Sequence, residues 1–253
     1  GTLQSSAPVG RNRIINGNMT IDQRNAGASV TIGAGAPYTL DRWQPNSSQA
    51  SKFSVQQNAG SVTPPTGFTN YLGVTSLSSY SVLSGEVFDL RQLIEGFNVA
   101  DLAWGTANAK TVTLSFWVRS SLTGTFGGAL RNSDNNRSYP FTYTVSVADT
   151  WEYKTVTIPG DTSGTWLTTT GRGMACNFGL GVGTDFSNTA GAWAGANYLS
   201  ATGAVSVIGT LNATWYITGV QLEAGSVATP FERRQYGQEL ALCQRYFQLR
   251  AGY

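Results

Sequence analysis

The segment 110–121 reads KTVTLSFWVRSS and alternates between two kinds of residue. Successive side chains of a β-strand point to opposite faces, so residues two apart share a face. One face of this segment is apolar and carries Val112, Leu114, Phe116 and Val118. The other face carries Thr113, Ser115, Trp117 and Arg119. The pattern therefore predicts a strand that covers a hydrophobic core with its first face only.

Similar runs recur along the chain, and they predict further strands over 38–44, 52–56, 72–77, 87–94, 141–147, 151–158, 174–182 and 215–222. Clusters of Gly, Pro, Asn and Ser between the runs, such as 62–67 and 160–164, supply turn geometry. No amphipathic helix separates the strands, and the chain lacks the repeat of roughly 40 to 50 residues that a propeller needs. The fold class that we expect is all-β: a jelly-roll β-sandwich of two antiparallel sheets with a short C-terminal α-helix.

The end of the chain carries the one strong helix signal. Thr229, Pro230 and Glu232 match a capping box with proline at the first helical position, which predicts that a helix begins at Thr229. Two apolar stripes follow: a seam of Tyr236, Leu240, Cys243 and Phe247, and a second stripe of Leu242, Tyr246 and Leu249. A helix that is apolar on two sides needs two covers. We therefore expect one stripe to pack on the sandwich and the seam to contact another subunit of a homo-oligomer.

The composition excludes several classes of function. Charged residues make up 12% of the 253 residues and the formal net charge is +2, so no nucleic-acid partner is expected. The chain has no histidine, which removes Ser-His-Asp and Cys-His nucleophilic sites and histidine-containing zinc sites. Cys176 and Cys243 have no metal-binding spacing, so we expect buried thiols, no metal and no cofactor. No apolar run approaches the roughly 18 residues of a membrane helix, and no membrane insertion is expected.

Six segments resemble those of a known family. They read IINGNMTIDQRNAG (14–27), YTLDRW (38–43), LRQLIEG (90–96), KTVTLSFWVRSS (110–121), TWEYKTVTIPGDTSGTW (150–166) and YITGVQLEAGSVATPFERRQYGQELALCQRYF (216–247). With these segments the chain is similar to the C-terminal domains of tail-fibre and related structural proteins of tailed bacteriophages. Those domains resemble carbohydrate-binding modules of the galactose-binding-like jelly roll.

The resemblance implies a part in the virion. A domain of this kind is a non-enzymatic, receptor-binding component of a tail fibre, acts outside the bacterial cell, attaches to a host surface glycan and often forms a homotrimer. Residues 1–13 would then be a linker to an upstream tail-fibre segment or the remainder of a purification tag. Residues 14–228 would be the jelly-roll β-sandwich, and 229–253 the C-terminal helical segment. The fold alone does not identify the ligand, since one sandwich carries many specificities.

Relatives among the carbohydrate-binding modules often hold a structural calcium ion between an N-terminal strand and the last strand. The corresponding stretches here are 16–18 and 217–220, with Asn18 and Gly219 where the relatives have carboxylates. Calcium prefers several hard oxygen ligands, usually with carboxylate charge. We therefore expect no calcium ion there, beyond weak binding to backbone carbonyls.

Two places offer groups that a glycan could bind. The Trp117 indole shares a face with hydroxyls and with the guanidinium of Arg119, which together make a stacking surface with hydrogen-bond donors. The second place is the polar loop 131–139 together with a tryptophan in a later loop, and its candidate residues are Arg131, Asp134, Arg137, Tyr139 and Trp193. The alternatives are structural: a Trp117 face covered by loops or another subunit, a solvated hairpin tip, and loops pinned to the sandwich by Trp104, Trp166 and Trp193.

A different class of function is also open. Four carboxylates lie close enough in sequence to suggest the pair of a glycosidase, whose carboxyl groups stand roughly 5 to 9.5 Å apart: Glu86, Asp89, Glu95 and Asp101. Because Glu95 alternates onto the side of Leu93 and Phe97, a structural hydrogen-bonding role is favoured for it. We expect the chain not to be an enzyme. The alternatives are a polysaccharide depolymerase, the carbohydrate-binding module of one, or a purely structural capsid or baseplate protein.

Overall fold

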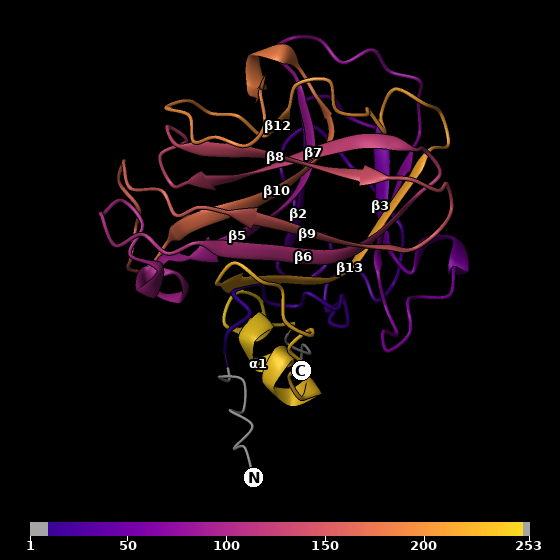
Figure 1. Ribbon diagram of the computed structural model, residues 1–253. Helices are drawn as coiled ribbons and strands as arrows, with labels where there is room; N and C mark the ends of the chain where they lie inside the picture. Colours follow the sequence, from indigo (N-terminus) through magenta and orange to yellow (C-terminus); the bar gives the residue numbers. More distant parts are fainter. Residues whose placement is uncertain (1–9, 250–253) are drawn as a thin grey trace.

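The computed structural model describes residues 10–249, in which two antiparallel sheets lie face to face (Figure 1). In spatial order, the six-stranded sheet consists of β1 (Val30–Thr31), β3 (Phe53–Gln57), β4 (Leu72–Ser76), β13 (Thr214–Ala224), β6 (Val112–Ser120) and β9 (Glu152–Ile158). The five-stranded sheet consists of β2 (Trp43–Ser47), β5 (Val87–Glu95), β10 (Arg172–Val182), β7 (Gly124–Asn132) and β8 (Ser138–Val145). The all-β jelly-roll sandwich that the sequence predicts is confirmed.

The remaining elements are short. A parallel pair of strands is formed by β11 (Ser187–Asn188) and β12 (Ser200–Ala201). The helices are α1 (Tyr236–Gln244) and the 3₁₀ helices η1 (Ala59–Ser61), η2 (Gly96–Asn98), η3 (Ala100–Leu102) and η4 (Thr184–Phe186). Within residues 10–249 no helix is long and apolar enough to cross a membrane. Residues 1–9 of the expected linker and 250–253 of the expected helical segment lie outside the described residues.

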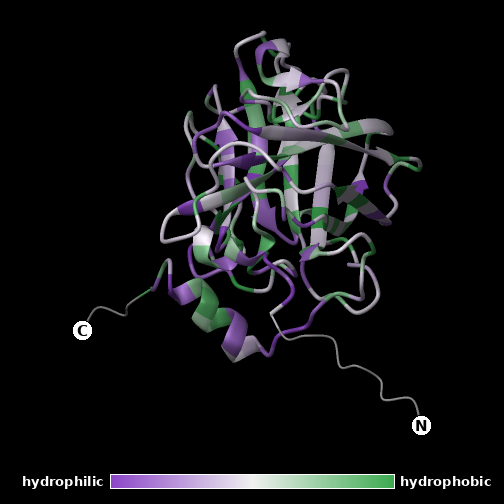
Figure 2. Cartoon of the chain, turned by 60° about the vertical axis from the view of Figure 1, so that its left-hand side comes forward, coloured by the Kyte–Doolittle hydropathy of each residue, from purple (hydrophilic) through white to green (hydrophobic). Residues whose placement is uncertain are grey.

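Aromatic side chains fill the space between the two sheets. Phe116 of β6 is fully buried, and its ring centroid lies 5.0 Å from that of Tyr143 on β8 and 5.1 Å from that of Phe178 on β10. The indole of Trp215 on β13 packs against Phe178 and donates a hydrogen bond of 3.0 Å to the Tyr143 hydroxyl. Edge-to-face aromatic contacts add to the free energy of burial. Figure 2 shows hydrophobic and hydrophilic residues alternating along the strands, as this one-sided burial requires.

The local pattern does not predict β7, because this strand is rich in glycine. A side chain on Gly127 would meet the hydroxyl of Ser200 at 2.3 Å, and one on Gly128 would meet the carbonyl oxygen of Asn177 at 2.3 Å. Glycine weakens a strand locally but permits such close approach. The strand therefore depends on its neighbours β10 and β12 rather than on its own composition.

The strand expected over 38–44 also differs, since β2 begins only at Trp43. Arg42, the residue before it, has a φ of +70° in the left-handed region, where an extended strand cannot continue. The N–H of Trp43 donates to the carbonyl of Leu40 at 2.9 Å, which closes a tight turn. The segment 38–42 is therefore a turn that leads into β2.

The C-terminal helix begins at Tyr236 and not at Thr229, so the expected helix start is wrong. The groups of the expected capping box have other partners. Thr229 donates from its N–H (2.8 Å) and its hydroxyl (2.7 Å) to the carboxylate of Glu223 on β13. The Glu232 carboxylate accepts the backbone N–H groups of Gly10 (2.6 Å) and Asn12 (2.7 Å). These bonds across the chain hold the segment before Tyr236 in a non-helical path along the N-terminal segment.

The expected seam of α1 packs largely on its own chain. Cys243 is buried against Ile15 and Ile21, and Leu240 lies at the edge of that cluster together with Leu242 and Tyr246 of the second stripe. The ring of Phe247 lies 3.7 Å below the guanidinium of Arg24. Tyr236 is the seam residue that stays open, with 62% of its surface exposed. Both stripes are therefore partly covered at the end of the sandwich where Figure 1 places α1, while Leu249 of the second stripe is 70% exposed.

We expect Phe116→Ala to lower the free energy of unfolding by about 3–5 kcal/mol, because the cavity removes the contact between the sheets. Urea unfolding followed by tryptophan fluorescence measures this loss. Phe97→Ala is the matched control, since Phe97 is 57% exposed, and it should change stability by no more than about 0.5 kcal/mol. Equal losses in the two variants would contradict the assignment of Phe116 to the core.

Candidate functional site

A cleft of about 620 Å³ lies on the outer face of the six-stranded sheet. We call it the Trp117 cleft, and the side chains that shape it are Phe68, Ser115, Trp117, Tyr153, Phe231 and Arg233. Trp117 points to this face because its neighbours in β6, Phe116 and Val118, are buried between the sheets. The volume falls within the roughly 300–1,000 Å³ of small-molecule sites.

The floor of the cleft is a pair of aromatic rings from neighbouring strands. Trp117 on β6 stands opposite Tyr153 on β9, and their ring centroids are 5.4 Å apart at an angle of 51°. On the other side Trp117 pairs with Thr218 of β13, and the next residue, Gly219, has a φ of +62°. A side chain on Gly219 would meet the Phe68 ring at 2.7 Å and Trp117 at 3.2 Å. Glycine at this position therefore lets the wall and the floor of the cleft meet.

One side of the Trp117 cleft, its wall, is formed by two loops that lie far apart in the sequence. Phe68 precedes β4 and Phe231 precedes α1, and their rings make an edge-to-face contact at 5.3 Å. The guanidinium of Arg233 lies 4.8 Å from the centroid of the Phe68 ring. In residues 10–249, Arg233 forms no ion pair, and the Trp117 indole N–H and the Tyr153 hydroxyl have no hydrogen-bond partner. The cleft thus combines aromatic faces with free donors.

Arg119 lies outside this cleft although it shares a strand face with Trp117. Its guanidinium pairs with the Asp149 carboxylate at 3.0 Å and lies 5.6 Å from the ring centroid of Tyr216. The pairing holds the turn between β8 and β9 close to β6. The structure therefore gives Arg119 a contact within the chain, while Trp117 keeps the place expected of it on the outer sheet face.

The loop 131–139 does not join Trp117 in one site. Arg131 is only 2% exposed, and its guanidinium donates to the side chains of Asn177 (3.2 Å), Asn135 (3.2 Å) and Asn197. Burial lowers the pKa of Arg131 to about 10. Asp134 is exposed at the tip of the loop, where it accepts the Ser133 hydroxyl at 3.0 Å.

The other loop candidates belong to a packed cluster. Arg137 donates two hydrogen bonds to the Asp161 carboxylate, at 2.7 and 2.6 Å. The ring of Trp193 lies within 5.3 to 5.6 Å of three others, those of Tyr139, Trp104 and Trp166. Its indole N–H donates to the carbonyl of Pro159 at 2.8 Å. In the structure the contacts of these residues fix loops to the sandwich. This arrangement matches the structural role that the sequence predicts as the alternative to glycan binding.

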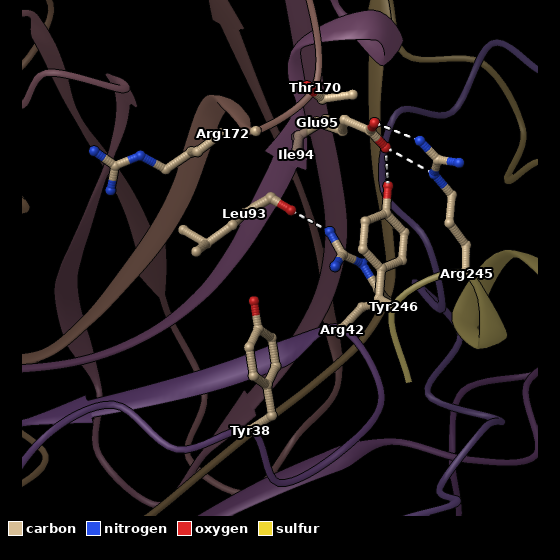
Figure 3. Close-up of a pocket in the computed structure, with 10 residues that line it drawn as sticks. Tyr38, Arg42, Leu93, Ile94, Glu95, Thr170, Arg172, Arg245 and Tyr246 are labelled. Carbon is tan, nitrogen blue, oxygen red and sulfur yellow. Dashed lines mark hydrogen bonds and ion pairs between the residues drawn. The ribbon is translucent and has the colours of Figure 1, made fainter. Parts of the chain in front are cut away.

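The four carboxylates considered for catalysis all have partners within the chain. Glu86 accepts the Leu83 N–H and the side chains of Gln49 and Tyr80, and Asp89 accepts from Asn46 and Asn177. Asp101 pairs with Arg13 at 2.7 Å. Glu95 accepts two hydrogen bonds from Arg245 (3.0 and 2.6 Å) and one from the Tyr246 hydroxyl (2.6 Å), as Figure 3 shows.

The hydrogen bonds that Glu95 accepts determine its pKa and hence its possible role. Hydrogen bonds from Arg245 and Tyr246 lower the pKa of Glu95 to about 2. A general acid in a glycosidase needs a raised pKa, so Glu95 is unsuited to that role. It instead fastens the residues after α1 to the end of β5.

The calcium position of the relatives lacks their carboxylates in this chain. The stretch at Gly17 does lie against β13, where the Val220 N–H donates to the Gly17 carbonyl at 2.9 Å. However, Asn18 and Gly219 bring no carboxylate, and the described part of the chain has no group of three or more acidic or cysteine side chains placed to hold a metal ion. Cys176 and Cys243 are buried and free, and burial raises the pKa of the Cys176 thiol to about 12.

We expect Glu95→Gln to lower the melting temperature at pH 7, because it removes the charge that Arg245 binds. The folded-state pKa of Glu95 is depressed from 4.5 to about 2, so its contribution is complete above pH 4.5 and is lost as the pH falls toward 2. Thermal unfolding at pH 7, 4, 3 and 2 should show the difference between wild type and variant shrinking over this range. Asp101→Asn, which removes an exposed carboxylate, should have little effect at any pH. A difference that stays constant from pH 7 to 2 would contradict the assignment.

No family model matches the sequence, and no curated protein matches it. Solved structures that are similar to the chain include the enzymatically active domain of tailspike protein 4 from bacteriophage CBA120, with 11% identity and a TM-score of 0.41. That similarity covers 85% of this chain, which spans 22% of the tailspike chain. A CBM4 structure has 15% identity, a TM-score of 0.39 and coverage of 83% of this chain and 98% of that one. The family 11 carbohydrate-binding module from Clostridium thermocellum, in complex with a β-1,3-1,4-mixed-linked tetrasaccharide, has 12% identity, a TM-score of 0.37 and coverage of 79% and 100%. The three TM-scores lie below 0.5, and nothing about ligand or activity follows from them.

Proposed function

We propose that this chain is a non-enzymatic glycan-binding domain and that the Trp117 cleft is its binding site. The observation that carries the proposal is the open pair of Trp117 and Tyr153 on the outer sheet face, with Tyr153 43% exposed. Large aromatic side chains are mostly buried, and an exposed aromatic pair that lines a cleft offers a surface for a ligand. A sugar ring presents apolar C–H faces that stack on aromatic rings and hydroxyls that bond to nearby donors and acceptors.

The cleft supplies both kinds of contact. The indole N–H of Trp117 and the hydroxyl of Tyr153 stand beside the stacking faces, and the hydroxyl of Ser115 lies one position along the same face of β6. Arg233 at the wall adds several donors in a planar fork. This combination of one apolar platform with a few polar groups is typical of sites that bind saccharides or similar polar ring compounds.

The resemblance of the sequence to phage tail proteins supports a more specific proposal. In this proposal the chain is the receptor-binding part of a tail fibre, located on the virion, and the Trp117 cleft attaches to a glycan on the host surface. The N-terminal segment from Gly10 and the segment around Glu232 are bonded side by side near α1 (Figure 1). An upstream fibre segment would then join at this end and leave the sheet faces free.

We expect Trp117→Ala to weaken glycan binding by about thirtyfold or more, since aromatic residues at the centre of a binding site contribute about 2 kcal/mol or more. The melting temperature should stay within a few degrees, because Trp117 is only half-buried. A glycan array of bacterial capsule and lipopolysaccharide polysaccharides identifies the ligand, and calorimetry with that ligand measures affinity.

Phe97→Ala removes an exposed aromatic ring elsewhere and should leave binding unchanged. Unchanged binding by Trp117→Ala would place the site elsewhere. Silence of the wild type on the array would contradict glycan binding altogether. Release of oligosaccharides from the bound polysaccharide would contradict the non-enzymatic part of the proposal.

A trimer is the assembly that the resemblance favours, and Tyr236 is the residue of the expected seam that remains open for it. Light scattering on the full chain should give about three times the mass of 26.9 kDa, and Tyr236→Asp should lower the mass by placing a charge in the contact. A dimer would contradict only the threefold symmetry. A monodisperse monomer at micromolar concentration would contradict the oligomer.

A further inference from the structure

A second cavity, of about 530 Å³, lies at the five-stranded sheet beside the residues that follow α1 (Figure 3). We call it the Arg42 pocket, and the side chains that matter are Tyr38, Arg42, Leu93, Glu95, Arg245 and Tyr246. They come from the turn before β2, from β5 and from the end of α1. The pocket is therefore built from three of the segments that carry the sequence resemblance and is separate from the Trp117 cleft.

Arg42 is a buried cation without a counter-ion. It is 6% exposed and its guanidinium lies 3.5 Å from the ring centroid of Tyr246. One nitrogen, Nη2, donates to the carbonyl of Leu93, while Nε is buried and has no hydrogen-bond partner. Among residues 10–249, Arg42 forms no ion pair and Nη1 makes no hydrogen bond. Burying a charge costs free energy unless the charge is paired, and no ion-pair partner in the described residues offsets this cost for Arg42.

The carboxylates near Arg42 are already bound. Glu95 lines the pocket but accepts three hydrogen bonds from Arg245 and Tyr246. Asp41, the neighbour of Arg42 in the chain, accepts the N–H of Gln23 (2.7 Å) and its side-chain amide (2.8 Å). Gln23 is neutral, so Asp41 keeps its negative charge, but neither carboxylate forms an ion pair with Arg42.

The other charged and titratable groups around the pocket form no ion pair with Arg42. The guanidinium of Arg172 points away from Glu95 in Figure 3 and donates to the Ser133 carbonyl and the Asn135 side chain. Arg24, behind the pocket, lies over the rings of Phe247 and Tyr38. The thiol of Cys243 nearby has a raised pKa because it is buried, so it stays neutral. No anion among these groups faces Arg42.

The backbone holds Arg42 in a conformation that arginine does not favour. Its φ of +70° lies in the region that suits glycine. Both neighbours are bonded to the buried Asn16: its side-chain amide donates to the Asp41 carbonyl at 3.0 Å, and its carbonyl accepts the Trp43 indole N–H at 3.0 Å. Such strain persists only where the surroundings impose it, and it clusters at binding sites. Here it aims a guanidinium into a cavity.

We propose that the Arg42 pocket binds the carboxylate of an acidic sugar unit. Nη1 of Arg42 has no partner in the described part of the chain and can donate a charge-assisted hydrogen bond to a carboxylate. An acidic sugar brings one negative charge together with apolar ring faces, whereas a free phosphate brings about −1.5 to −2 and no apolar face. The pocket has room for a whole sugar unit, and the Tyr38 and Tyr246 rings beside Arg42 suit its apolar faces. The proposal names a substrate class for glycan binding and in this respect rests on the proposed function, although it uses a different site.

Calorimetry and thermal shift on the full chain with sodium D-glucuronate test the proposal. D-glucose and inorganic phosphate are the comparison ligands. We expect glucuronate to bind and to raise the melting temperature, with glucose and phosphate each weaker by about tenfold or more. Arg42→Gly, which suits the backbone at φ +70°, and Arg42→Gln should both weaken glucuronate binding by about tenfold or more. Arg119→Gln, an arginine outside both cavities, should bind as the wild type does.

An NMR titration of the wild-type protein tests the proposal without depending on variants, which could fail to fold. In ¹H–¹⁵N spectra the Nε–H signal of Arg42 should shift on titration with glucuronate and not with glucose. Absence of this shift, or equal binding by the Arg42 variants, would overturn the proposal. Phosphate binding as tight as glucuronate binding would also overturn it, in favour of a general anion site. If Trp117→Ala has no effect on glycan binding while Arg42→Gly does, the proposed cleft is wrong and the Arg42 pocket stands.

Discussion

The contact of Phe116 with Tyr143 and Phe178 joins the two sheets, and the remaining structure depends on it. Strand β6 can bury Phe116 only by turning the next residue outward, because side chains alternate along a strand. Trp117 is thus placed on the outer face by the same constraint that fills the core. A tryptophan on that face becomes a binding platform only because Tyr153 stands opposite it on β9. One face of β6 therefore packs in the core, and its opposite face contributes to the candidate site.

A second constraint organises the end of the sandwich near α1. Asn16 is fully buried and bonds to the turn that contains Arg42, to the Trp43 indole and to Glu239 of α1. A buried residue whose backbone and side-chain amide bond to several distant segments leaves little freedom for those segments. The N-terminal segment, the turn before β2 and the helix therefore take up one arrangement together. Glu95 adds a charged fastening between β5 and Arg245 in the same region.

The chain has few charges and uses most of its carboxylates for fastening. Glu223 and Glu232 hold the segment before α1, Asp161 holds Arg137, and Glu95 holds Arg245. Burying these carboxylates costs desolvation free energy, which well-placed hydrogen-bond and ion-pair partners offset. The same bonds fix one path for loops that lack regular secondary structure. The guanidinium of Arg42 departs from this pattern, because it packs on the Tyr246 ring and forms no ion pair among residues 10–249. Arg137 and Arg245 are paired with carboxylates and stabilise the fold, whereas Arg42 is left without such a pair in the described part of the chain, as the proposed ligand site requires.

The alternation of residues along the chain predicts the strands with a clear period of two, the sandwich class and the outward direction of Trp117, because these depend on neighbours in the sequence. Only the tertiary structure decided that Tyr153 and Phe231 would meet Trp117, since strand register and loop docking join residues far apart in sequence. The same reason explains the misplaced helix start, where Glu223 binds Thr229 and overrides a local capping signal. It also explains why the alternation predicts a strand at Arg42, where the structure has a turn. The left-handed backbone of Arg42 is imposed by bonds that join both of its neighbours to Asn16, which no pattern of adjacent residues contains.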